Sequence, residues 1–285
     1  MSDKPRPSSV LCPSCGSLVG IRDEKCLICG RARPGLFGLT PLLRGLGEDL
    51  GFLQLVMWTC GVLFLVSLAI DIEGIGSGGF LSFLSPSGRS LLVLGASGTY
   101  PVFDLGRWWT VLSAGWLHGG VLHIVFNMMW IRQAAPATAH LYGGARMVII
   151  YVFSSVTGFL LTSSVGYFLP FLPGPLRGGQ LTIGASAALC GLVGALLWYG
   201  HRGGSSQATQ YAKSFLMGAF LFGFLVPGID NWGHIGGLAG GWLMARFLDP
   251  LRPERGDHAV VAVVCLGLSF LSIVVSVITA LPAFR

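Results

Sequence analysis

Long apolar stretches alternate with short polar segments along most of this 285-residue chain. A helix that crosses a bilayer needs about 20 mainly apolar residues, and seven stretches approach that length. The segment between the first two stretches is half apolar but broken by Gly and Pro, so we expect it to lie in the membrane interface. The pattern predicts spans at about 52–70, 116–136, 146–168, 184–200, 211–227, 232–248 and 258–281.

The fourth and sixth of these stretches are short and rich in Gly and Ala. Gly237, Gly241 and Ala245 recur every four residues and therefore share one helical face. Small residues at this spacing let two helix backbones approach closely. We expect these two helices to pack at the centre of the protein.

Composition supports a membrane protein. The chain is 53% hydrophobic and only 11% charged, whereas soluble domains have roughly 25% charged residues. The fold class predicted is an all-α polytopic membrane protein. We expect no cleavable signal peptide, because the first 50 residues hold no apolar segment of the required kind.

The net charge of +6 reflects orientation rather than nucleic-acid binding. With the N-terminus inside, 14 of the 18 Lys and Arg residues fall in cytoplasmic segments or at cytoplasmic helix ends. The exceptions are Arg89, Arg107, Arg177 and Arg285. This positive-inside bias predicts a multi-pass protein of the plasma membrane with a cytoplasmic N-terminus and an outside C-terminus.

Four of the seven cysteines form two C-x-x-C pairs, Cys12/Cys15 and Cys26/Cys29. Paired thiolates at this spacing are typical of a zinc ribbon, and four thiolates leave no open position for catalysis. Disulfides or free thiols are the alternative, which a reducing cytoplasm disfavours. We expect structural zinc in a docking or regulatory module, whose partner the sequence does not identify.

Ser186 and His234 are the main candidates for chemistry. Ser186 opens the fourth span, where free N–H groups and the helix dipole favour a nearby oxyanion. His234 begins the sixth span, and a serine beside an imidazole is the minimum for an activated nucleophile. Each could instead be structural, Ser186 as a helix cap and His234 as a hydrogen-bonded packing residue. Because no Asp or Glu occurs at 105–229, we expect a dyad rather than a triad.

Further polar residues lie near the outer end of the second span. His123 and Asn127 are four residues apart and so share a helical face, where their side chains could donate to the oxygen of a tetrahedral intermediate. A metal pair or interhelical hydrogen bonds are the alternatives. Metal hydrolysis would also want a carboxylate base, which this region lacks.

These residues together resemble the rhomboid intramembrane serine proteases, over about residues 50–250. The matching motifs are Arg107-Trp108-Trp109-Thr110, His118-x4-His123-x3-Asn127, Gly184-x-Ser186 and His234-x2-Gly237-x3-Gly241. The resemblance implies a six-helix bundle with a seventh helix added, open to water from the outer face. It implies Ser186 as nucleophile, His234 as general base and acid, His123 and Asn127 in the oxyanion hole, and a structural role for His118.

The chain departs from the family pattern in three places. Ala187 stands where a glycine often follows the nucleophile. Cys190 occupies the position of an aromatic residue that commonly stacks on the catalytic histidine. Gly106 precedes Arg107 where a tryptophan is frequent.

The predicted function is therefore a serine endopeptidase that cleaves peptide bonds in or near transmembrane segments of other proteins, without a catalytic cofactor. An inactive rhomboid-like protein that binds membrane clients in quality control is the alternative, but such relatives typically lack Ser186 or His234. A transporter would need a polar path across the bilayer. The predicted organisation is a zinc-ribbon-like module at 1–35, a linker at 36–50, the protease core at 51–250 and an additional C-terminal helix at 251–285.

Overall fold

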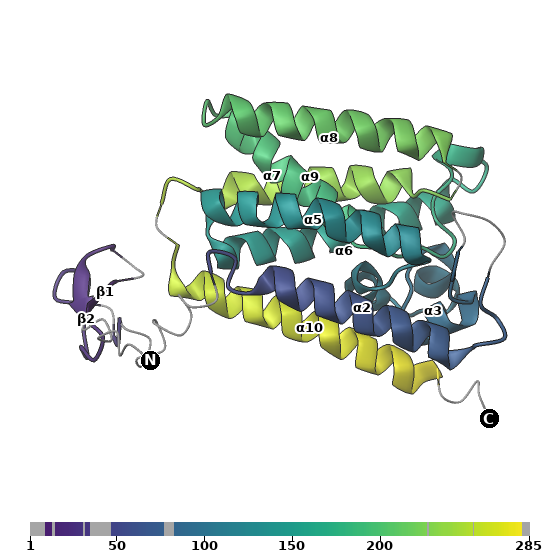
Figure 1. Cartoon of the computed structure of the whole chain (residues 1–285), viewed down its shortest axis with the longest axis horizontal. Coiled ribbons are helices and arrows are strands. Elements are labelled where there is room, and N and C mark those ends of the chain that lie inside the picture. The colour runs from purple at the N-terminus through teal and green to yellow at the C-terminus, as the bar shows by residue number, and fades with distance from the viewer. Residues whose placement is uncertain are drawn as a thin grey trace, which may run out of the picture.

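A computed structural model describes residues 9–12, 15–30, 32–34, 47–76, 83–226, 228–252 and 254–280. Seven long helices form the main body (Figure 1), one for each apolar stretch in the sequence. They are α2 (Phe52–Ile70), α5 (Val121–Tyr142), α6 (Gly144–Phe168), α7 (Ser186–His201), α8 (Ser206–Leu225), α9 (Asn231–Phe247) and α10 (Gly256–Ala280). The prediction of an all-α polytopic membrane protein is confirmed.

Not every helix is long and apolar enough to cross a bilayer by its own composition. Among the described residues α2, α6 and α10 meet that criterion, and the bent pair Thr110–Trp116 and α5 is a fourth candidate. The 16-residue helix α7 is apolar but shorter. Residues 187–196 of α7 are all buried, so this helix is enclosed by its neighbours and does not need the length of a lipid-facing span.

The start of the second span differs from the prediction. Residues 114–116 form a 3-10 turn (η4), and α5 begins only at Val121 after a bend of 90°. Leu117 is extended at the end of the turn, and Gly119-Gly120 follows. The span predicted to start at about residue 116 is therefore broken, and its long helix starts only at Val121, because the two glycines favour this break. The helix instead runs on through Pro136 to Tyr142.

Short helices fill the segment between α2 and α5, at the right-hand end of the bundle in Figure 1. They are α3 (Gly88–Leu94), a π-helical turn η3 (Tyr100–Asp104) and α4 (Thr110–Ser113). Arg107 joins this region to α10, because its guanidinium donates to the carbonyl oxygens of Leu92 (2.9 Å) and Ser276 (2.7 Å). Gly106 has a φ of +66°, which explains a glycine at this position.

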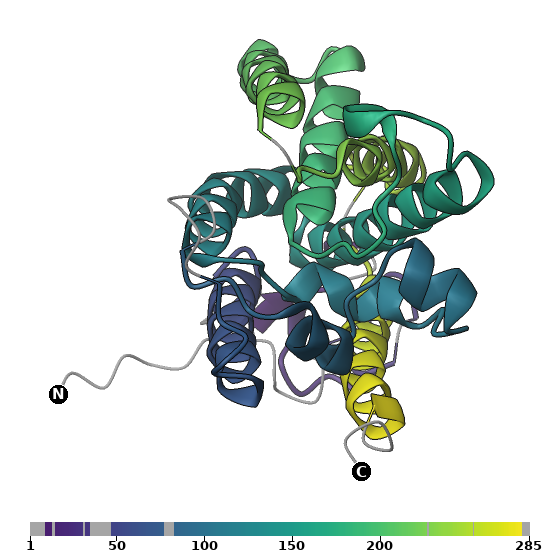
Figure 2. The ribbon, with the colours of Figure 1, turned by 90° about the vertical axis from the view of Figure 1, so that its right-hand side faces the viewer.

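Helices α6, α7 and α9 meet through glycines at the centre of the body, where Figure 2 shows α9 end-on beside α7. A β-carbon on Gly237 would lie 2.0 Å from the Ala187 carbonyl oxygen, and one on Gly241 would lie 1.9 Å from that of Gly191. The predicted close packing of the fourth and sixth helices is confirmed. Gly158 of α6 completes the contact, since its β-carbon would lie 2.8 Å from the Ala187 β-carbon.

The N-terminal segment forms a small antiparallel ribbon of β1 (Ser9–Leu11) and β2 (Leu18–Gly20). Val10 pairs with Val19, and both are buried against Cys12 and Cys26. A core of this size is too small to stabilise a fold alone, so we expect a further cross-link to stabilise this ribbon.

Candidate active site

Ser186 is the first residue of α7. The loop before it is fixed by a hydrogen bond from the Gly184 N–H to the Ala114 carbonyl oxygen (3.0 Å). Gly184 has a φ of +120°, a conformation that side chains rarely permit. The serine is therefore held at a helix N-terminus, where the first N–H groups have no partner within the helix.

His234 faces Ser186 from the first turn of α9. Its Nε2 lies 2.9 Å from Ser186 Oγ, within hydrogen-bond distance, although 48 residues separate the two in sequence. Both residues are only partly buried. The close approach of α7 and α9 at Gly237 thus places a nucleophile beside a base.

Asp230 fixes the start of α9 but does not complete a triad. One carboxylate oxygen accepts from the Gly233 N–H (2.8 Å) and the other from the Thr182 hydroxyl (2.6 Å). Within the described part of the chain, no carboxylate makes a hydrogen bond to His234. The Thr182 bond ties the loop that precedes Ser186 to the helix that carries His234. An aspartate before a helix can be recognised in the sequence as an N-cap. Nothing in the sequence indicates that Thr182 binds it.

His123 of α5 also lies close to the serine. Its Nδ1 accepts a hydrogen bond from the Gly119 N–H (3.2 Å). A neutral imidazole that accepts at Nδ1 carries its proton on Nε2, so this backbone contact assigns Nε2 as the donor. Nε2 lies beside Gly184, where a β-carbon would be 2.6 Å from it and 3.8 Å from Ser186 Oγ. The glycine thus leaves room between the imidazole and the serine.

The two other candidate residues, Asn127 and His118, both contact His123. Asn127 is buried one turn below His123 and donates from Nδ2 to the His123 carbonyl oxygen (2.8 Å). Among the hydrogen bonds of the described residues, it has none to Ser186 or His234. His118 is buried against His123, with ring centroids 5.1 Å apart in an edge-on arrangement. These contacts are typical of residues that hold a neighbouring side chain in position, in this case the His123 ring.

Three residues in or near these motifs, Ser97, Ala187 and Cys190, are buried and contribute to packing. Ser97, in the similar string Gly95-Ala96-Ser97-Gly98, is buried and paired through its backbone with Thr182. Ala187 packs towards Gly158, so a glycine on the facing helix accommodates the methyl group. Cys190 is buried in the core of the bundle.

The four N-terminal cysteines also lie together. All four sulfur atoms are within 4.8 Å of one another, with Cys12 and Cys29 3.7 Å apart and Cys15 and Cys26 3.6 Å apart. Four sulfurs at about 2.3 Å from a tetrahedral zinc would be separated by about 3.8 Å. The cluster can therefore hold a metal ion.

The chain is similar in sequence to known proteins. Residues 105–250 match the Rhomboid domain. Rhomboid protease GluP of Bacillus subtilis is 32% identical over 168 residues, which are 58% of this chain and 31% of that protein. RHOMBOID-like protein 4 of Arabidopsis thaliana is 30% identical over 180 residues, 61% of this chain and 42% of that protein.

The chain thus spans less than half the length of these two relatives. A shorter relative, YdcA of Bacillus subtilis, is 31% identical over 153 residues, 53% of this chain and 71% of that protein. The matched domain covers half of the chain and includes Ser186, His234, His123 and Asn127. The chain belongs to the rhomboid family.

Proposed function

We propose that this protein is an intramembrane serine endopeptidase that works through a Ser186–His234 dyad. The observation that carries the proposal is the 2.9 Å contact between Ser186 Oγ and His234 Nε2. In the proposed reaction His234 takes the hydroxyl proton while Oγ attacks the scissile carbonyl carbon. The imidazolium then protonates the departing amine, and a water activated by His234 hydrolyses the acyl-enzyme.

The negative charge on the tetrahedral intermediate needs donors that are already in place. The proposed donors are the Ser186 N–H and the Nε2–H of His123, whose proton position follows from the Gly119 contact. Asn127 supports them from the next turn of α5. The N-terminal end of α7 adds its dipole.

The proposed substrates are membrane proteins cut in or near a transmembrane segment, at small or helix-destabilising residues. A peptide carbonyl inside a regular helix is bonded to the chain and closed to attack, so the substrate must unwind at the cut. The family supports this class, since residues 105–250 match the Rhomboid domain and GluP is a rhomboid protease. The proposed location is the plasma membrane, with the N-terminus cytoplasmic and the C-terminus outside.

An inactive rhomboid-like binding protein is less well supported. Such a protein has no need for a nucleophile beside a base, yet Ser186 and His234 are both retained and in contact. Reaction with a fluorophosphonate in detergent separates the two functions. We expect the wild-type protein to be labelled and Ser186→Ala to remain unlabelled while keeping its thermal unfolding midpoint. Wild-type protein that is folded but unlabelled would contradict the protease proposal.

We also propose that residues 1–35 form a zinc module, that 36–50 link it to a protease core at 51–250, and that 251–285 add a further helix. A hydrogen bond with the Ser17 hydroxyl, aided by the Ser17 backbone, lowers the pKa of the Cys15 thiol from 9.0 to about 6. At neutral pH this favours the thiolate, the form that binds zinc. The metal would act as the cross-link that the small ribbon core requires.

Removing two of the four ligands is expected to release the metal. Cys12→Ser/Cys15→Ser protein should lose about one zinc per chain, measured by elemental analysis after purification. Cys60→Ser/Cys265→Ser is the matched control, because these thiols lie outside the cluster. Equal zinc content in the wild type and the Cys12/Cys15 variant would exclude the proposed site.

A further inference from the structure

A cleft of about 130 Å³ opens between the last turns of α7 and α9. This is the end of the bundle opposite Ser186 and His234, which lie in the first turns of the same helices. Arg202, the residue after α7, and Arg246, in the last turn of α9, both line the cleft. On the orientation proposed above, the cleft lies at the cytoplasmic surface of the membrane.

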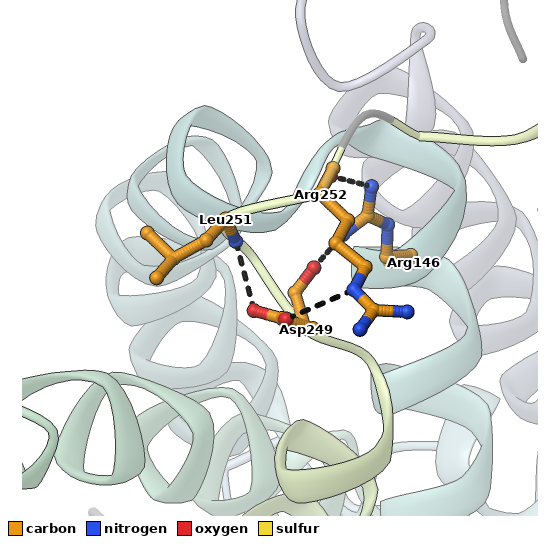
Figure 3. A network of polar contacts seen from close by, with 4 residues as sticks. All are labelled: Arg146, Asp249, Leu251 and Arg252. Carbon is orange, nitrogen blue, oxygen red and sulfur yellow. Dashed lines mark hydrogen bonds and ion pairs between the residues drawn. The ribbon is translucent and has the colours of Figure 1, made fainter. Parts of the chain in front are cut away.

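The cleft has a net positive charge. Asp249 is the only carboxylate among the described residues that line it, and its charge is already compensated. One carboxylate oxygen lies 3.4 Å from Arg252 Nε, and the other accepts from the Leu251 N–H at 3.0 Å (Figure 3). The two cleft arginines are therefore available to an anion.

The wall of the cleft is held in place by a third arginine. Arg146 is fully buried, and its guanidinium donates to the carbonyl oxygens of Asp249 and Arg252, as Figure 3 shows. These bonds fix the turn after α9 from inside the bundle. A preformed wall reduces the ordering cost of binding a ligand.

Aromatic and apolar side chains surround the two arginines. The Arg202 guanidinium carbon lies 5.9 Å from the centre of a Trp198 ring, and Tyr199 also lines the cleft. Trp and Tyr are enriched at the level of lipid headgroups. Leu251 lines the cleft and is 78% exposed, and Phe247, which follows the cleft residue Arg246 in sequence, is 72% exposed. An acyl chain that leaves the cleft could contact these apolar side chains.

We propose that this cleft binds the phosphodiester of an anionic phospholipid. Arg202 and Arg246 would hold the phosphate, and one acyl chain would run over Phe247 and Leu251. Basic pockets between membrane helices on the cytoplasmic side suit such headgroups. A free phosphate ester carries the same kind of negative charge but has no acyl chain to contact the exposed apolar residues. We therefore assign a lipid as the ligand.

Thermal unfolding of the full-length protein in a neutral detergent tests the site. Added phosphatidylglycerol should raise the unfolding midpoint, whereas phosphatidylcholine and glycerophosphoglycerol, a headgroup without acyl chains, should leave it unchanged. Arg202→Gln/Arg246→Gln protein should bind phosphatidylglycerol about 30-fold more weakly, as expected for the loss of two cationic contacts. Lys213→Gln/Arg255→Gln changes the net charge equally outside the cleft and should keep wild-type affinity.

Three results would overturn the proposal. They are equal stabilisation of both double variants, no stabilisation of the wild type by phosphatidylglycerol, and an equal effect of glycerophosphoglycerol. Native mass spectrometry of the single variants Arg202→Gln and Arg246→Gln provides a second measurement, in which each should retain fewer bound phosphatidylglycerol molecules than the wild type. Unchanged lipid occupancy in both single variants would also contradict the site. None of these readouts depends on proteolysis.

Discussion

Alanine at Ser186 or at His234 is expected to lower kcat/KM for peptide cleavage by about 10⁴-fold or more, and the double variant should be no worse than either single one. The two side chains act as one unit, because the hydroxyl is a weak nucleophile without a base to take its proton. Among the described residues no carboxylate makes a hydrogen bond to His234, so the prediction treats the two side chains as a dyad. The activity left in each variant comes from binding and the oxyanion donors alone.

The measurement is the rate at which a single-span fusion protein is cut after reconstitution with the enzyme in liposomes. Ser97→Ala is the matched control, since Ser97 lies in a similar Gly-Ala-Ser-Gly string but is buried and paired with Thr182. Its folded protein should cleave at the wild-type rate. A His234→Ala variant that keeps a tenth of the wild-type rate would refute the dyad, as would a double variant far below both single ones.

The positions of the helices and of the two proposed dyad residues could be predicted from local sequence features. Apolar stretches located the seven helices, and polar residues at the starts of two of them indicated Ser186 and His234. The break before α5 is not predicted, because a hydropathy window averages over the Gly119-Gly120 pair. Local patterns thus predict which elements form, and predict their ends less well.

The contacts that assemble the site join segments far apart in sequence, and no local pattern encodes them. The Gly119 N–H that sets the proton position on His123 is a backbone group with no residue signature. The bond from Thr182 to Asp230 links two helix starts across 48 residues. Ala187 departs from the family pattern, but Gly158 on another helix makes room for it.

Adding one methyl group at Gly241 is expected to destabilise the protein and to remove its activity. The β-carbon of Gly241→Ala would lie 1.9 Å from the Gly191 carbonyl oxygen and 2.5 Å from the Gly191 Cα. Both atoms belong to the backbone of α7, so the two helices must move apart. Overpacking of this kind costs about 1–3 kcal/mol, and sometimes more. Separation of α7 from α9 would also increase the distance between Ser186 Oγ and His234 Nε2.

Alanine at two other glycines, Gly240 and Gly267, provides a comparison for the expected destabilisation. At Gly240 the new methyl group would meet the Thr157 hydroxyl at 2.0 Å, a side-chain atom that can rotate away, so Gly240→Ala should be destabilised less. At Gly267 in α10 nothing lies within 4 Å, and alanine should stabilise the helix by up to about 1 kcal/mol. Unfolding midpoints in detergent should therefore fall in the order Gly267→Ala, Gly240→Ala, Gly241→Ala, and fluorophosphonate labelling should follow the same order. If Gly241→Ala protein unfolds at the wild-type midpoint, the helices tolerate separation and close backbone packing is not what holds the dyad together.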